Sequence, residues 1–163
     1  MGPISVDISI DAPREQVFDD ICDLSRRPAW AGDLVSDYRL ERLEASGRGA
    51  AARFRVDAPG GIRYMETVIT EADRPHKVVE HGHGGHLDRV AVGAVWELVE
   101  GEGSVTVVTL TFWTEPAAVL DRVRELGRAS RWWRRRWSRA LRLLRDQLES
   151  PDGAPEPVRV AGG

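Results

Sequence analysis

The order of its segments constrains the fold of this chain most: consecutive strand-like stretches are followed by one long amphipathic helix. Residues 4–10 alternate apolar and polar side chains, which is the period of a strand with one buried face. Pro13 suits a first helical position, and the spacing after it predicts two short helices between residues 13 and 30. Six more strands are predicted at residues 34–43, 50–56, 63–72, 76–83, 89–99 and 105–113.

The long helix is predicted over residues 116–149, with Gly127 as a candidate position for a bend or a division. Its apolar side chains recur every three or four residues and form one stripe, which comprises Val119, Val123, Leu126, Ser130, Trp133, Trp137, Leu141, Leu144 and Leu148. A sheet of consecutive strands cannot cover its own apolar face. We therefore expect this helix to lie across the sheet, with Trp133 and Trp137 toward it, and to leave a cavity between the two.

The same helix concentrates positive charge. Residues 121–149 carry ten Arg against four Asp and Glu, a net charge of +6, which leaves −9 on the remainder of a chain whose total is −3. Basic residues interleaved with Trp at 131–137 are compatible with phosphates or anionic lipid headgroups. Because Trp133 and Trp137 belong to the apolar stripe, we favour the simpler alternative, a solvated Arg face on a closing helix. We expect no nucleic-acid partner.

Composition points to one ordinary globular domain. A length of 163 residues suits a single hydrophobic core. No apolar run approaches the ~18 residues of a membrane span, no signal-peptide pattern opens the chain, and the single cysteine, Cys22, excludes an internal disulfide. We expect a cytoplasmic protein without an integral membrane segment, with a domain at residues 1–149 and a disordered tail at 150–163. The sequence is also compatible with a homodimer. The absence of Asn and the single Lys indicate a high-GC coding bias of the kind found in actinobacteria.

Several short motifs together carry a family resemblance. They are Ala12-Pro13 before Val17-Phe18, Asp23, Trp30 after Pro28, Gly47 and Gly49, Glu66 with Val68, Glu71 ahead of Pro75, Trp96 with Leu98, and the hairpin at Gly103. Over residues 4–149 the chain resembles the START and birch-pollen-allergen superfamily (SRPBCC), and within it the polyketide cyclase/dehydrase and lipid-transport-like proteins. The resemblance implies an α+β helix-grip fold: a seven-stranded antiparallel sheet wrapped around the C-terminal helix, with two short helices after the first strand.

Polar side chains at alternate positions supply candidate ligand contacts. Tyr64 and Glu66 share one face of their strand, as do His81 and His83, and we expect one or two of these four groups to hydrogen-bond a ligand in the cavity. If the face of Tyr64 and Glu66 points to water instead, that pair has no specific role. A solvated strand end remains the alternative for the histidines. Two imidazoles are also plausible metal ligands, but without a third ligand in the pattern no metal site is predicted. Four tryptophans serve either as cavity walls or simply as core: Trp96, Trp113, Trp133 and Trp137.

Two functions fit these features. The first is a binding module that holds a hydrophobic small molecule, polyketide-, aromatic- or lipid-like, without chemistry. The alternative is an aromatase/cyclase-type enzyme that uses the same cavity for cyclisation or dehydration, with much of the acceleration coming from enclosure. The sequence contains no nucleophile elbow, phosphate-binding loop or dinucleotide fingerprint, so no catalytic residue is assigned and no cofactor is expected.

Overall fold

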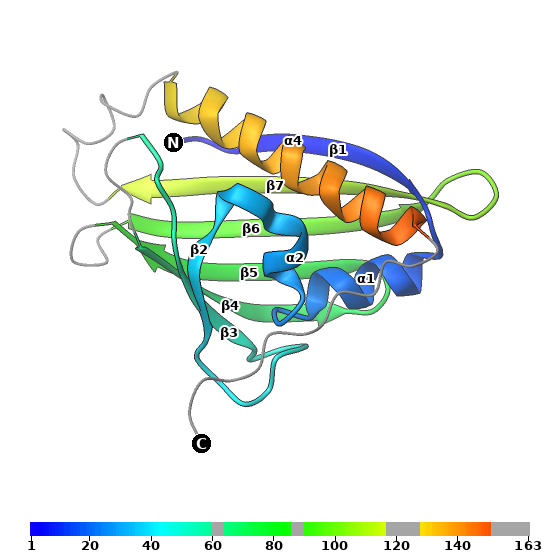
Figure 1. The fold of residues 1–163 in the computed structure, drawn as a ribbon, viewed down its shortest axis with the longest axis horizontal. Coiled ribbons are helices and arrows are strands. Elements are labelled where there is room, and N and C mark those ends of the chain that lie inside the picture. The colour runs from blue at the N-terminus through cyan, green and yellow to red at the C-terminus, as the bar shows by residue number, and fades with distance from the viewer. Residues whose placement is uncertain (60–63, 86–89, 117–127, 151–163) are drawn as a thin grey trace.

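Seven strands form a single antiparallel sheet in the computed structural model, which describes residues 1–59, 64–85, 90–116 and 128–150 (Figure 1). The strands are β1 (Ile4–Asp11), β2 (Ser36–Leu40), β3 (Ala51–Arg55), β4 (Tyr64–Asp73), β5 (Lys77–Gly84), β6 (Val90–Glu100) and β7 (Val105–Pro116). Their order across the sheet is β1-β7-β6-β5-β4-β3-β2. Strands β2 to β7 therefore lie beside their neighbours in sequence, whereas β1 pairs with β7, so that β1 and β2 form the two edges.

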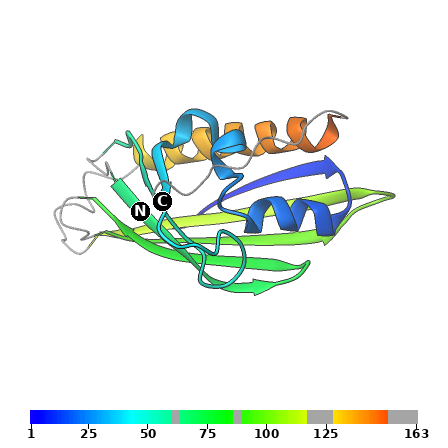
Figure 2. The same ribbon diagram turned by 60° about the horizontal axis from the view of Figure 1, so that its bottom comes forward.

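The helices lie on one face of this sheet, as Figure 2 shows. Three short elements connect β1 to β2, namely α1 (Arg14–Cys22), α2 (Arg27–Ala31) and the 3-10 turn η1 (Gly32–Leu34). The long helix α4 (Arg128–Glu149) crosses the sheet beside β1 and contacts α2 and η1. We call the helix-covered side of the sheet the inner face and the opposite side the outer face. The predicted helix-grip arrangement is confirmed.

The core lies between the inner face and α4. Trp133 and Trp137 are almost fully buried, and their rings lie 4.5 and 5.6 Å from that of Phe112 on β7. The prediction that both indoles face the sheet is therefore confirmed. Burial of apolar surface between the sheet and the helix is the main favourable contribution to the folding free energy of such a two-layer fold.

Two boundaries differ from those expected from the sequence. Pro116 is the last residue of β7, where it pairs with Val90, and does not begin the final helix. A proline can stand at a strand end because the ladder hydrogen bond it cannot donate is not needed there. Leu34 belongs to η1, so β2 is shorter than predicted, and a register shift interrupts its pairing with β3 between Ser36 and Arg39. The expected helical stretch at residues 117–127 lies outside the described residues, as does the expected tail beyond Ser150.

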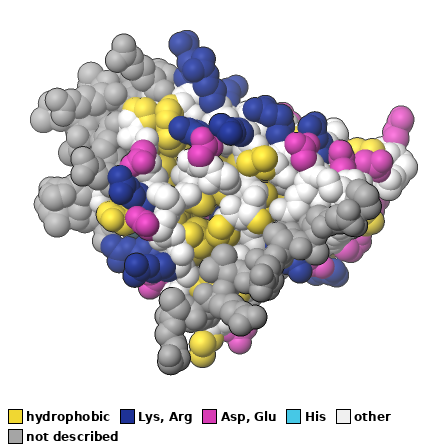
Figure 3. All heavy atoms as spheres, in the orientation of Figure 1, with side chains coloured by type: hydrophobic (Ala, Val, Ile, Leu, Met, Phe, Trp, Pro, Cys, Tyr) yellow, Lys and Arg dark blue, Asp and Glu magenta, His cyan; other side chains and the backbone are white. Residues whose placement is uncertain are grey.

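Basic side chains gather along α4 on the face seen in Figure 3. Arg131, Arg134 and Arg135 are exposed, while Arg136 and Arg139 both contact the carboxylate of Asp33 in η1. Two of the described arginines of α4 thus pair with an acidic residue of η1. No helix in the described ranges combines the length and apolar character that crossing a membrane requires.

Candidate ligand-binding sites

An aromatic cluster fills the middle of the inner face. Trp96 on β6 stands edge-on to Trp30 of α2, with ring centroids 5.9 Å apart, and edge-on to Trp137 of α4 at 5.6 Å. Edge-to-face geometry at this separation is favourable because the positive ring edge meets the negative ring face. The cluster therefore ties the sheet, α2 and α4 together through packed aromatic rings.

A buried ion pair lies beside this cluster. The guanidinium of Arg27 donates to both carboxylate oxygens of Glu80, with Nη1–Oε2 at 2.6 Å and Nη2–Oε1 at 2.7 Å. Thr67 Oγ1 and Trp96 Nε1 donate to the same carboxylate at 2.8 and 2.7 Å. Arg27 also donates to the carbonyl oxygen of Ile21 at 3.2 Å, and its guanidinium lies 5.4 Å from the ring centroid of Trp30.

The electrostatics keep this pair charged. Burial alone would raise the pKa of Glu80, but the charge of Arg27 and the hydrogen bonds from Arg27, Thr67 and Trp96 outweigh it, so the pKa lies below its ordinary value. Burial likewise opposes the charge on Arg27, and Glu80 more than compensates, so the pKa of Arg27 is raised. A carboxylate offers about four acceptor positions, and four donors use them here. Glu80 is thus poorly placed to act as a general base.

Three donors in the same interior have no acceptor among the described residues, namely Nε of Arg27 and the two indole nitrogens of Trp30 and Trp137. The indole nitrogens of Trp30 and Trp137 are buried and make no hydrogen bond, although each ring is packed against Trp96. Buried polar groups in folded proteins are nearly always paired, so an unpaired one needs an explanation. An oxygen atom supplied from outside the chain would satisfy either indole donor.

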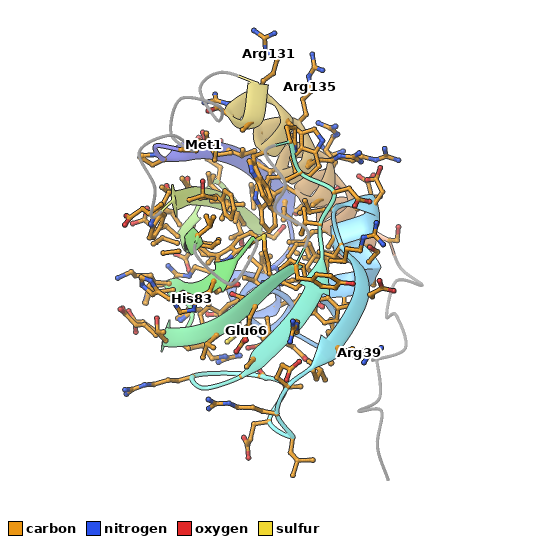
Figure 4. All side chains as sticks on the ribbon, turned by 90° about the vertical axis from the view of Figure 1, so that its left-hand side faces the viewer. Met1, Arg39, Glu66, His83, Arg131 and Arg135 are labelled. Atoms are coloured by element: carbon orange, nitrogen blue, oxygen red, sulfur yellow. The ribbon has the colours of Figure 1, made fainter. Side chains whose placement is uncertain are left out.

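The structure divides the sequence-predicted site residues between the two faces of the sheet. Trp96, Trp133 and Trp137 lie on the inner side, within the core. The polar groups expected beside them are elsewhere: Tyr64, Glu66, His81 and His83 are exposed on the outer face, and Figure 4 shows His83 on the side of the sheet away from α4. Their expected position between sheet and helix is wrong, because β4 and β5 direct Met65, Thr67, Val78 and Glu80 inward instead. Whether they contact a ligand stays a prediction.

A hollow of about 600 Å³ on the outer face brings together most of these displaced residues. Glu66, His81, His83 and Trp113 all line it, whereas Tyr64 lines a separate, more polar depression and lies under the guanidinium of Arg53. Among the described residues, no three His, Cys, Asp or Glu side chains are grouped closely enough to hold a metal ion.

The sequence interpretation missed Arg27 and Glu80. The burial of Glu80 could have been inferred, because Val78, Glu80 and Gly82 occupy alternate positions of β5 that face inward. A charge at such a position requires a buried partner. The burial of Arg27 could not, since a short helix between two turns gives no periodicity from which it follows.

The fold and its buried interior define a helix-grip protein, a sheet that closes around one C-terminal helix. The chain belongs to the polyketide cyclase/dehydrase and lipid transport family, whose family model matches residues 1–149. No curated protein shows significant sequence similarity to this chain.

Solved structures agree on the fold. The solution structure of the KanY protein superposes with a TM-score of 0.70 at 19% identity, over 92% of this chain and 100% of the other. The major latex-like protein 151 of Panax ginseng gives 0.68 at 14% identity, over 91% and 98% of the two chains. DynU16, a putative protein in the dynemicin biosynthetic locus, gives 0.64 at 16% identity; 94% of this chain matches 49% of that one. At these identities the likeness concerns the fold alone.

Proposed function

We propose that this protein binds a hydrophobic small molecule, polyketide-, aromatic- or lipid-like, on the inner face between the sheet and α4. The observation that carries the proposal is the pair of unpaired indole N–H groups of Trp30 and Trp137, buried in an aromatic interior. Family membership supports the same conclusion, since the family is described by polyketide cyclisation and lipid transport.

These donors narrow the chemistry of the ligand. Leaving a buried donor unpaired costs about 1–3 kcal/mol, so an acceptor oxygen delivered to Trp30 or Trp137 would recover part of that free energy. The surrounding rings favour an apolar, preferably planar body. The ligand class is therefore an apolar molecule that carries at least one carbonyl or hydroxyl oxygen.

An aromatase/cyclase-type activity is the second candidate, favoured by the family description. Such an enzyme would need a general base, and the buried carboxylate of Glu80 cannot serve as one. The four donors around Glu80 leave no oxygen lone pair to accept a substrate proton. A cyclase on this inner face would therefore depend on enclosure and on the indole donors.

Native mass spectrometry of the purified protein tests the proposal directly. We expect a co-purifying apolar molecule, or binding of an added probe such as 1,8-dihydroxyanthraquinone or oleic acid, which separates the aromatic class from the lipid class. Trp30→Phe and Trp137→Phe should each weaken binding by about 1–3 kcal/mol, since each removes one donor. Trp132→Phe is the matched control because Trp132 is partly exposed on α4. Equal binding by all three variants would contradict the assigned contacts.

A further inference from the structure

The outer hollow is built from two rows of residues that run across four neighbouring strands, β4, β5, β6 and β7. Register pairs join the members of each row, so their side chains emerge on the same face at the same level. The first row is Val68, His81, Gly93 and Trp113, and the second is Glu66, His83, Ala91 and Glu115.

The floor of the hollow follows from the residues on β6. Gly93 and Ala91 have almost no side chain, whereas the flanking strands carry imidazoles on one side and Trp113 and Glu115 on the other. Neighbouring strands lie about 4.8 Å apart, so the backbones of β5 and β7, which carry the side walls of the hollow, are roughly 10 Å apart. The small side chain of Ala91 therefore leaves a groove on the outer face of β6, while the ring of Trp113 covers the neighbouring Gly93. This groove is unrelated to the inner face.

Trp113 is held in a defined position within this groove. Its ring lies directly over Gly93, where an added Cβ would come 2.1 Å from the ring, and His81 meets it edge-on at 6.0 Å. The indole is nonetheless only half-buried. A fixed, accessible indole is the side chain that attracts an organic cation most strongly.

The charge of the groove matches such a ligand. Glu66 and Glu115 are exposed, and within the described residues neither side chain makes an ion pair or hydrogen bond. Arg53, the register partner of Glu66, lies with its guanidinium 5.7 Å from the ring centroid of Tyr64. The carboxylate of Glu115 beside the indole and that of Glu66 across the hollow thus leave an excess of negative charge among the described side chains that line it.

From this arrangement we propose that the groove on the outer face binds a small organic cation, an ammonium group on an apolar body. The cation lies against Trp113 and near the carboxylate of Glu115 on the same strand, while Glu66 adds negative charge from the far side of the hollow, three strands or roughly 14 Å away. The apolar part rests on Ala91 and Val68. The site is independent of the inner-face function, since it shares no side chain with the aromatic cluster.

Choline and its neutral isostere 3,3-dimethylbutan-1-ol test the proposal in the intact protein. The indole N–H signal of Trp113, assigned by comparison with Trp113→Phe, reports binding in a ¹⁵N NMR titration. We expect choline to shift this signal and the isostere to bind roughly tenfold more weakly, because only the cation gains from the indole and the carboxylates. Equal affinity for the two molecules, or no choline-dependent shift, would overturn the proposal.

Variants locate the site. Ala91→Leu should fill the floor and abolish binding, and Glu115→Gln should weaken it roughly tenfold through the lost charge. Glu97→Gln is the control, because Glu97 is an exposed carboxylate of β6 outside the hollow. If Glu97→Gln weakens binding as much as Glu115→Gln, binding is non-specific attraction and the proposal fails. It also fails if sedimentation shows a dimer that Ala91→Leu dissociates, since a second copy then occupies the groove.

Discussion

Arg27 and Glu80 are 53 positions apart in the sequence, yet their side chains form a fully buried ion pair with two hydrogen bonds of 2.6 and 2.7 Å. The pair fixes α2 against β5 directly beside Trp30 and Trp96. Its position makes it the main polar anchor of the inner face in the described part of the chain.

Removal of one partner should therefore be costly. Glu80→Gln leaves the guanidinium of Arg27 buried without a counter-charge, and we expect a loss of about 3–5 kcal/mol in the free energy of unfolding. Urea denaturation measures the loss. Arg74→Gln serves as the control, because its pair with Asp19 is exposed and should change stability little. The double variant Arg27→Met/Glu80→Leu should recover much of the loss, and a double variant as unstable as Glu80→Gln would contradict the account.

The same pair predicts how stability depends on pH. The pKa of Glu80 lies below its ordinary value of 4.5, so at low pH the unfolded chain binds this proton more readily than the folded protein does. The contribution of Glu80 to stability is therefore present above pH 4.5 and is lost as the pH falls from there through the lowered pKa. Unfolding free energies measured across the acid range should show a weaker acid dependence for Glu80→Gln than for the parent protein. Parallel curves would exclude this role.

Trp133 tests the packing of α4 on the sheet. It is 1% exposed and lies against Phe112, so Trp133→Ala should cost about 3–5 kcal/mol, the range for deleting a buried large aromatic side chain. Arg134→Ala, one position on and exposed, is the matched control and should leave the thermal midpoint nearly unchanged. A loss below about 1 kcal/mol for Trp133→Ala would show that the residue is not part of the core.

Gly82 tests the close approach of β4 and β5. A Cβ at this position would come 1.8 Å from the carbonyl oxygen of Glu66, so the two strands must shift to admit any other residue. We expect Gly82→Ala to destabilise the protein by about 1–3 kcal/mol, as overpacking does elsewhere. The comparison is Gly2→Ala, where an added Cβ meets nothing within 4 Å. If both variants melt at the same temperature, the strand contact is looser than the structure shows.

The Arg face of α4 should not bind nucleic acid. Arg136 and Arg139 contact Asp33, and Trp133 and Trp137 between the exposed arginines are buried against the sheet and cannot stack on bases. Titration of labelled single-stranded and duplex DNA at moderate salt should reveal no tight binding. A sub-micromolar affinity that falls steeply with added salt would reverse this prediction, since counterion release marks phosphate contacts.

The strands and the closing helix could be predicted from the sequence because periodicity reports burial along each element. Trp133 and Trp137 followed from their spacing in one stripe. The face to which Tyr64 and His83 belong could not be predicted, because both parities of β4 and β5 mix apolar and polar residues, and a shift of one residue exchanges the two faces. The pairing of Arg27 with Glu80 depends on tertiary contact alone, so no local pattern contains it.

The central claim is that an apolar ligand binds on the inner face through the indole donors of Trp30 and Trp137. The most direct measurement is a ¹⁵N NMR titration of the six tryptophan side-chain N–H signals with 1,8-dihydroxyanthraquinone. We predict that the signals of Trp30 and Trp137 move downfield as the ligand oxygen accepts their hydrogen bonds, while that of Trp113 on the outer face stays in place. Movement of Trp113 alone, with Trp30 and Trp137 unchanged at saturation, would contradict the claim.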